Sequence, residues 1–314
     1  MKIKIGICAF ILVIQSAQVF SLGLKDCSLT PAEEEDSRIE HIFGGAPDDS
    51  IIYERRAYLF SYDKKYNVPQ WTAWHVIPPY RDTPKRKSRW STFRTDPELN
   101  HVKTKDYIGW YDSEFNYARG HIAPYFISGG DRDHDGKDAE YESDLKIEDP
   151  DDACTVFEIN AMTNVAPQYH KRFNGSPGVW WQLETDMRMM LDNGHEFYVF
   201  AGTVFLENKE VMNIGNRKED PDAWDIGVPH GYFKMIIDPI KNEVVAFLFD
   251  HADDLNKGCN IDIAKWPSNC IVDVSDIESI TGLKFFSELN KGLSDRLRNS
   301  SNQKTWMNWR NDNL

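Results

Sequence analysis

One histidine stands in a sequence context that could support acid–base chemistry on a phosphate ester. His121 lies in the segment ARGHIAP at 118–124, two residues after Arg119. A neutral imidazole can take a proton from water, and a guanidinium can pair with two phosphate oxygens at once. A single histidine is more often a structural residue, so this interpretation depends on the groups that accompany it.

A second polar cluster follows farther along the chain. It begins at Asn164 in the segment NVAPQ and continues with Asn174, Glu184 and Arg188. Asparagine and glutamate oxygens suit Mg²⁺, which keeps most of its waters and is bound partly by substrate phosphate. One base, one hard cation and two or three arginines are the groups needed to hydrolyse a phosphodiester. The simpler alternatives are a surface ion pair between Glu184 and Arg188 and turn-forming roles for the two asparagines.

The elements that would position these groups indicate an α+β domain with a sheet-rich core. Apolar residues recur at helical spacing over residues 180–191, so Glu184 and Arg188 share one face of a predicted helix. A short helix stopped by Gly282 is predicted within residues 277–286. Strands are predicted at 58–62, 71–76, 156–162, 197–200, 232–237 and 244–249, the first two as a β-hairpin.

The 314 residues divide into four predicted segments. Lys2 and Lys4 precede an apolar run that is typical of a signal peptide and too short to span a bilayer. We therefore expect a secreted, extracellular protein without a membrane segment. The predicted segments are a signal peptide at 1–21, an N-terminal arm at 22–55, a main domain at 56–290 with an acidic insertion at 129–153, and a polar C-terminal tail at 291–314.

Composition and charge exclude several classes of protein. Apolar residues make up 41% and charged residues 27%, as in globular proteins with a full core rather than in disordered or multi-span membrane proteins. With 36 Lys+Arg and 50 Asp+Glu the net charge is -14, so bulk charge does not attract nucleic acid. A polyanion must therefore meet a local basic strip, and residues 85–94 are rich in lysine and arginine.

The cysteines indicate disulfide bonds. Five cysteines become four when Cys8 leaves with the signal peptide. An even number in an exported protein is typical of disulfide pairing, and four cysteines allow three pairings. Cys259 and Cys270 close a short loop, which favours Cys259–Cys270 together with Cys27–Cys154.

The order of these motifs resembles that of the DNA/RNA non-specific endonucleases of the ββα-metal group. This is the family of the secreted bacterial non-specific nucleases and mitochondrial endonuclease G. The resemblance covers about Tyr58 to Phe286 and implies an α+β, ββα-metal nuclease fold with a central antiparallel sheet flanked by helices. The motifs that carry it are RGH at 119–121, NVAPQ at 164–168, Asn174, and the W-x-x-x-E of Trp180 and Glu184.

The resemblance implies a role for each matching residue near the metal. His121 matches the general base that activates the attacking water. Asn174 matches the single protein ligand of the catalytic Mg²⁺, which Mn²⁺ could replace, and Glu184 matches a carboxylate that holds a water on that ion. Asn164 matches an asparagine on the substrate side of the site, a positioning residue rather than a metal ligand.

Arginines match the groups of the family that handle the phosphate. Arg119 and Arg188 match arginines that contact phosphate or stabilise the transition state. Arg89 is the predicted further substrate-binding arginine, with Arg86 and Arg94 as the alternatives.

Two features depart from the family pattern. Ala118 stands before the RGH segment where the family has an aspartate, so the hydrogen bonding of this segment should differ. Asn174 and Glu184 are ten residues apart, slightly more than is usual, which predicts a reshaped metal loop around Ser176 and Pro177.

The acidic insertion contains a candidate metal site of another kind. Asp131, Asp133, Asp135, Gly136 and Glu142 fit the pattern D-x-D-x-D-G-x5-E of EF-hand loops. The flanking residues do not resemble the two helices of an EF-hand. The alternatives are therefore a structural Ca²⁺ site and a solvated acidic loop.

The sequence as a whole predicts a secreted, Mg²⁺-dependent endonuclease that hydrolyses DNA and RNA to 5′-phosphate products. A homodimer, as in many relatives, is left open. The alternative is a catalytically weak, nuclease-like extracellular binding module with a Ca²⁺-binding acidic loop. Ala118 favours this alternative slightly, whereas the presence of His121, Asn174 and Glu184 favours the enzyme.

Overall fold

The structure is a computed structural model of the chain. It describes residues 22–99, 102–111, 116–133, 135–137, 140–141, 143–215, 225–252 and 254–311. The predicted signal peptide at 1–21 and the predicted calcium ligand Glu142 lie outside the described residues. Within those ranges, no helix combines the length and the apolar character that crossing a bilayer requires.

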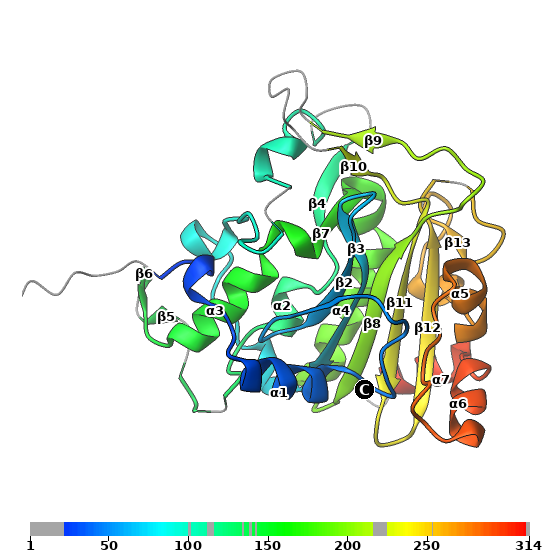
Figure 1. The fold of residues 1–314 in the computed structure, drawn as a ribbon. Coiled ribbons are helices and arrows are strands. Elements are labelled where there is room, and N and C mark those ends of the chain that lie inside the picture. The colour runs from blue at the N-terminus through cyan, green and yellow to red at the C-terminus, as the bar shows by residue number, and fades with distance from the viewer. Residues whose placement is uncertain are drawn as a thin grey trace, which may run out of the picture.

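An eight-stranded sheet forms the centre of the molecule (Figure 1). Its strands follow the order β1-β2-β3-β8-β11-β12-β13, with β14 also paired to β12. The pairs are antiparallel apart from β12–β13 in the described part of the chain. The α+β class, the hairpin and the three later predicted strands are confirmed. The bounds are β1 Ile52–Glu54, β2 Leu59–Asp63, β3 Val68–Val76, β8 Phe197–Val204, β11 Gly231–Asp238, β12 Glu243–Asp250, β13 Cys259–Asn260 and β14 Ile271–Val272.

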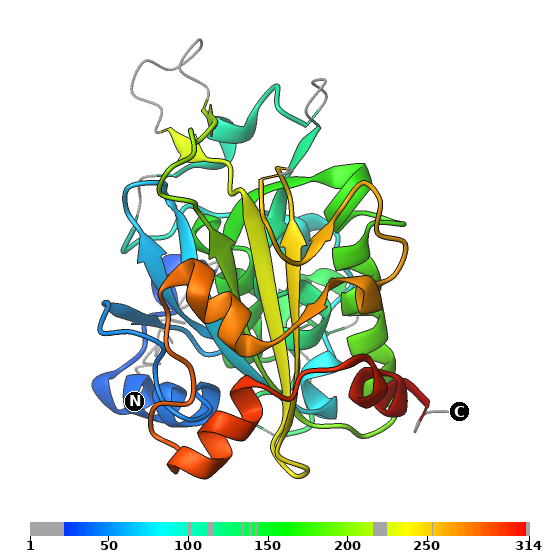
Figure 2. The ribbon, with the colours of Figure 1, turned by 90° about the vertical axis from the view of Figure 1, so that its right-hand side faces the viewer.

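Helices cover both faces of the sheet, and each face buries its own apolar cluster. On one face α2, α3, α4 and α7 pack with Trp74 and Tyr232. On the other face α5 and α6 pack with Trp71 and Phe200. Figure 2 shows these two helices in front of the sheet. The predicted helices at 180–191 and 277–286 correspond to α4 and α5. The bounds are α1 Pro31–His41, α2 Tyr125–Ser128, α3 Pro150–Ile159, α4 Val179–Asp192, α5 Val274–Thr281, α6 Lys291–Arg298 and α7 Gln303–Asn311.

Two short strands outside the main sheet, β4 (Tyr117–His121) and β7 (Val165–Tyr169), pair antiparallel. β7 runs directly into one π-helical turn, His170–Asn174, which ends shortly before α4. The hydroxyl of Tyr232 on β11 donates a hydrogen bond of 2.6 Å to the carbonyl of Pro167, which ties β7 to the central sheet. The other small elements are β5 Glu140–Tyr141 with β6 Ser143–Ile147, β9 Asn213–Ile214 with β10 Ile226–Gly227, and 3-10 turns at Leu24–Asp26, Pro78–Arg81, Ser88–Ser91, Thr104–Tyr107, Met162–Asn164 and Pro267–Cys270.

The strand predicted at 156–162 is wrong, because most of this run lies in α3. Asp149 begins the helix by accepting hydrogen bonds from the backbone N–H groups of Asp151 and Asp152, and Pro150 occupies its first turn. α3 is buried on almost every side. Only residues 156–159 of the predicted run belong to the helix, and a short apolar run of this kind cannot be told from a strand by pattern alone.

The segment predicted as a polar tail, 291–314, contains two packed helices. Trp306 of α7 packs edge-on against Phe247 of β12, with ring centroids 5.1 Å apart. Trp309 donates from its indole N–H to the carboxylate of Glu243, and both indoles are buried. The few large apolar side chains of this segment complete the core, although most of its residues are polar.

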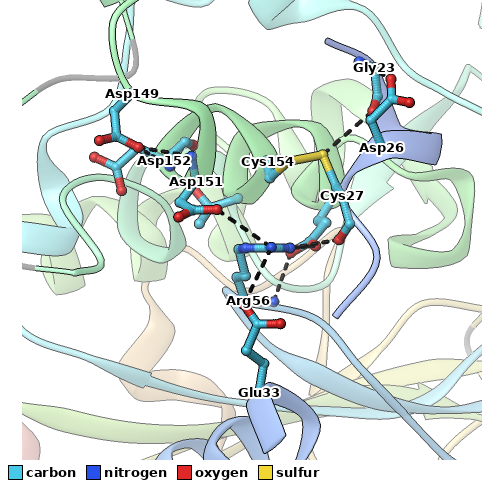
Figure 3. The surroundings of a disulfide bond; sticks show 11 residues. Gly23, Asp26, Cys27, Glu33, Arg56, Asp149, Asp151, Asp152 and Cys154 are labelled. Carbon is cyan, nitrogen blue, oxygen red and sulfur yellow. Dashed lines mark hydrogen bonds and ion pairs between the residues drawn. A yellow bond between two sulfur atoms is a disulfide. The ribbon is translucent and has the colours of Figure 1, made fainter. Parts of the chain in front are cut away.

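Both predicted disulfides are present. Cys27–Cys154 joins the N-terminal arm to α3 (Figure 3), and Cys259–Cys270 closes a loop after β12. The arm is therefore anchored covalently to the main domain. It is also anchored by β1, which pairs with β2 at the edge of the sheet.

Arg56 reinforces the contact between the arm and α3. Its guanidinium donates to the carbonyl of Cys27 at 2.6 Å and to the carboxylate of Glu158 at 3.2 Å. Asp151 and Glu33 lie within ion-pair distance of the same guanidinium, at 3.5 and 3.8 Å (Figure 3). Burial raises the pKa of Glu158 to about 7, although Arg56 lowers it. The arm and α3 thus share one charged, partly buried contact beside the disulfide.

Replacing Cys27 and Cys154 together by alanine should reduce the free energy of unfolding more than replacing Cys259 and Cys270 together. The two bonds span 127 and 11 residues. A longer closed loop removes more entropy from the unfolded chain. In the loop-closure model the stabilisation is about 5 kcal/mol for Cys27–Cys154 and about 3 kcal/mol for Cys259–Cys270. Urea unfolding of both double variants, followed by circular dichroism, measures the difference. A larger loss from the short loop would contradict this prediction.

Candidate active site

A cleft of about 790 Å³ is bordered by the β4–β7 pair, α2 and α4. Five of the predicted functional side chains line it, namely Arg119, His121, Asn174, Glu184 and Arg188. These residues come from three separate segments of the chain, and the fold brings them to one place. Arg89 and Asn164 do not line the cleft.

The pairing of β4 with β7 explains the glycine of the RGH segment. A Cβ atom on Gly120 would lie 2.0 Å from Oε1 of Gln168, so only glycine fits beneath this side chain. Gln168 lies opposite Ala118 in the strand register. Its amide is buried at the cleft, and neither of its polar atoms has a hydrogen-bond partner among the described residues. Gln168 was not predicted to be a functional residue, and the one sequence signal for it is its place in the NVAPQ segment.

His121 is held by Asn160, which follows the last turn of α3. Nε2 of His121 lies 3.2 Å from Oδ1 of Asn160. The amide nitrogen of Asn160 donates to the carbonyls of Trp90 and Val156, so its oxygen faces the imidazole. Nε2 therefore carries the proton, and Nδ1 keeps the lone pair that a general base needs.

Phe93 forms an aromatic platform for this part of the site. Its ring stacks on the imidazole of His121, with centroids 4.9 Å apart. The guanidinium of Arg119 lies 4.5 Å from the ring centroid and that of Arg86 lies 5.6 Å from it. One phenyl ring thus contacts His121 and two arginines, although the sequence pattern does not single out Phe93 for this role.

The environment of His121 keeps its imidazole neutral. Burial lowers the pKa of His121 to about 3, and the nearby cations Arg86 and Arg119 lower it further. The hydrogen bond to Asn160 opposes this shift. An imidazole with a pKa below its ordinary value is unprotonated at neutral pH, which is the form that can accept a proton.

Asn164 is buried and engaged entirely with the backbone. Its side-chain oxygen accepts from the N–H of Ala123 at 2.9 Å, and its amide nitrogen donates to the carbonyls of Ala123 and Ile159. Its own carbonyl accepts from the N–H of Ile122. These contacts fix the segment that follows His121, so they support a positioning role for Asn164 rather than direct contact with a substrate.

The π-helical turn presents Asn174 to the cleft. Oδ1 of Asn174 lies 3.2 Å from Nδ1 of His170, which also lines the cleft. Gly178 has backbone atoms of Phe173 so close that a Cβ could not be accommodated, so the turn between Asn174 and α4 is compact. His170 was not identified from the sequence, because residues 170–174 show no apolar pattern that predicts a helical turn there.

Two charged side chains of α4 face the cleft. Glu184 accepts a hydrogen bond of 3.2 Å from Nζ of Lys234, a buried lysine on β11. Arg188 donates to the hydroxyl of Thr185 at 2.6 Å and lies near the ring of Phe126. Burial lowers the pKa of Arg188, with Glu184 opposing that shift, but an arginine stays protonated at neutral pH.

The structure distinguishes the three arginines considered for additional phosphate binding. Arg86 lines the cleft, and its guanidinium lies above the rings of Phe93 and Tyr125. Arg94 is directed elsewhere, with its guanidinium 4.0 Å from the ring centroid of Phe157. Arg89 lies beside Trp90, outside the cleft. The alternative Arg86 therefore has the position that this role requires, and the role of Arg89 stays a prediction.

The acidic loop gathers three of its predicted ligands. Carboxylate oxygens of Asp131, Asp133 and Asp135 all lie within 4.8 Å of one another. The backbone N–H groups of Asp135 and Gly136 donate to the side chains of this cluster. Ca²⁺ binding at this loop stays a prediction.

Comparison with known proteins assigns the chain to a class. Residues 39–292 match the model of the DNA/RNA non-specific endonuclease family, and the chain belongs to this family. It is therefore a nuclease, a hydrolase whose substrates are nucleic acids. Members of the family generally use a divalent metal ion. The family and the fold implied by the resemblance are confirmed.

Individual relatives agree with this assignment. Nuclease C1 of Cunninghamella echinulata var. echinulata is 24% identical over 249 residues, which are 79% of this chain and 87% of that protein. A nuclease of Nostoc sp. is 23% identical over 299 residues, 92% of this chain and 94% of that protein. EndoG, in a crystal structure of its complex with the inhibitor EndoGI, matches with a TM-score of 0.57 and 20% identity over 84% of this chain and 95% of that chain. This last match shows the same fold.

The imidazole of His121 should stay neutral from about pH 8 down to about pH 5, well below the ordinary titration range near 6.5. The reason is that burial holds its pKa at about 3. NMR of protein with labelled histidines measures the protonation, and the resonance of His121 is assigned by its absence from His121→Ala. A titration midpoint near the ordinary value would show that the imidazole is solvated and is not held as described.

Proposed function

We propose that this protein is a secreted, Mg²⁺-dependent endonuclease that hydrolyses phosphodiester bonds of DNA and RNA to 5′-phosphate and 3′-hydroxyl ends. The observation that carries the proposal is the content of one cleft. A neutral imidazole, an amide oxygen, a carboxylate and three arginines line it together. These are the parts that phosphodiester hydrolysis requires: a base, a site for a hard cation and positive charge for the phosphate.

The donor set of the cleft fits a divalent cation of the magnesium type. Asn174 and Glu184 supply oxygen atoms only, which hard cations prefer. If Nδ1 of His170 donates to Oδ1 of Asn174, the amide oxygen keeps a second lone pair for a cation. The cleft leaves room for the waters that Mg²⁺ retains. Such an ion would neutralise charge on the phosphate and act as a Lewis acid.

The side chains divide the remaining chemistry between them. Nδ1 of His121 takes a proton from the attacking water as the water oxygen bonds to phosphorus. The bond from phosphorus to O3′ breaks, and O3′ takes a proton from solvent. Arg119, Arg188 and Arg86 contact phosphate oxygens and stabilise the charge that builds up on them.

The exposed apolar side chains of the cleft support binding without sequence preference. Ile108, Tyr111 and Phe126 line the cleft and expose 54%, 47% and 39% of their surface. Tyr111 lies beside His170 on the side of Asn174, and Phe126 lies beside Arg188. Aromatic rings on two sides of the site can stack on any base, because every base has a flat face.

Secretion and the electrostatic binding of nucleic acid are supported by the disulfides and by the charge of the cleft. Two disulfides in a chain of this size are typical of an oxidising compartment, which supports secretion. The cleft concentrates arginines although the chain as a whole carries a net charge of -14. Binding should therefore depend on this local charge and weaken as salt is added. A homodimer stays a prediction.

The mature protein should degrade both plasmid DNA and RNA in the presence of Mg²⁺, and EDTA should stop the reaction. His121→Ala should lower kcat by roughly 10²–10⁴-fold, because it removes the general base. Asn174→Ala should lose activity by weakening metal binding. Gel assays measure cleavage, and circular dichroism of each variant tests folding. Near-normal activity of folded His121→Ala would refute the assignment of the base.

Tyr111→Ala and Phe126→Ala should each weaken binding of single-stranded DNA by about 1–3 kcal/mol, the usual contribution of one stacked base. A labelled oligonucleotide bound to the inactive His121→Ala protein, followed by fluorescence anisotropy, measures this affinity. Trp266→Ala is the matched control, because Trp266 is 59% exposed but does not line this cleft. Equal losses in all three variants would contradict stacking in the cleft.

A further inference from the structure

Lys234 is a buried lysine under the active-site cleft. It lies in β11, at the centre of the sheet, and its side chain is 0% exposed. Its ammonium group donates to Oε1 of Glu184 at 3.2 Å. The same nitrogen lies 3.7 Å from the ring centroid of Trp180 and 5.8 Å from that of Trp74. One carboxylate oxygen and two indole faces thus replace the water around this charge.

A buried ion pair such as Lys234–Glu184 contributes little to the stability of a fold. Removing an ammonium from water costs more than a single hydrogen bond returns, and well-packed apolar residues of similar volume stabilise such positions equally well or better. The indole faces offset part of the cost through cation–π attraction. Stability alone therefore does not explain why this buried position carries a charged side chain.

Glu184, the partner of Lys234, connects the buried ammonium to the cleft. The side chain of Glu184 is 14% exposed and lines the cleft, whereas Lys234 is closed off from it. Oε1 of Glu184 is occupied by Lys234, and Oε2 has no hydrogen-bond partner among the described residues. The ammonium therefore holds one oxygen of a carboxylate that lines the cleft and leaves the other oxygen uncommitted.

We propose that Lys234 is a positioning residue, which holds Oε1 of Glu184 and thereby orients the second carboxylate oxygen toward the divalent cation site of the cleft. This inference rests on the proposed function. Lys234 does not touch the substrate or the reacting atoms. It acts through Glu184, in the way that outer partners orient the groups around a metal.

The sheet gives this arrangement its rigidity. Residues 232 and 234 point to the same face of β11, because side chains alternate along a strand. Tyr232 bonds to the backbone of β7, and Lys234 bonds to Glu184 on α4. The central strand β11 therefore supports both sides of the cleft, and β8 and β12 hold it on either edge through their ladders.

Lys234→Met tests the proposal, because methionine is unbranched and nearly as long as lysine but carries no charge. We expect the variant to fold with a lowered melting temperature, because the Glu184 carboxylate is left without its partner. Its kcat and its affinity for Mn²⁺, measured by calorimetry without nucleic acid, should both fall by roughly 10–100-fold. KM for nucleic acid should stay unchanged, since the arginines that contact phosphate are untouched. Lys234→Arg should recover part of the Mn²⁺ affinity, and Lys241→Met, at the β11–β12 turn, should change neither quantity.

Normal kcat and normal Mn²⁺ affinity in folded Lys234→Met would overturn the proposal. If that variant does not fold, the double variant Lys234→Met with Glu184→Gln removes both charges and is compared with Glu184→Gln alone. Equal activity of the two supports action through Glu184, and a further loss of the same size contradicts it. Absence of metal-dependent cleavage by the wild type would refute the proposed function instead, while the Mn²⁺ titration would still test Lys234.

Discussion

The orientation of His121, the proposed general base, depends on one hydrogen bond at the end of a helix. Nε2 of His121 meets Oδ1 of Asn160, and the amide of Asn160 is itself fixed by two backbone carbonyls. Since Asn160 directly follows α3, any contact that holds α3 also holds the imidazole. The Cys27–Cys154 disulfide and the Arg56–Glu158 pair both act on α3. The N-terminal arm therefore contributes to the active site without touching it.

The part of the cleft around Asn174 and Glu184 is held in place by the strand β11. Asn174 lies in a π-helical turn between β7 and α4, and β11 bonds to β7 through Tyr232 and to α4 through Lys234. The proposed base is thus held by a helix, and the proposed metal-binding residues Asn174 and Glu184 are held by the central sheet. Both sides are fixed before a substrate arrives, which is the condition for electrostatic stabilisation of a transition state.

A large part of the fold and of the site could be predicted from the sequence. The α4 helix, the β2–β3 hairpin and both disulfides were predicted from local signals: helical spacing, alternating strand patterns and loop length. Five cleft residues were predicted because they occur in short motifs. Asn160, Phe93 and Lys234 were missed, because each acts through a neighbour that is distant in the chain. The last turn of α3 was predicted as part of a strand, because the apolar run at 156–162 is too short for its periodicity to separate a helix from a strand.

The sequence by itself determined which chemical groups are present and on which elements most of them lie, because residue type and local spacing are properties of the chain. Only the tertiary structure decided which arginine enters the cleft, which nitrogen of His121 carries the proton and which charge lies beneath Glu184. Those outcomes depend on contacts such as His121–Asn160 and Glu184–Lys234, in which 39 and 50 residues of sequence separate the partners. Distances between such residues arise from packing, which no local pattern encodes.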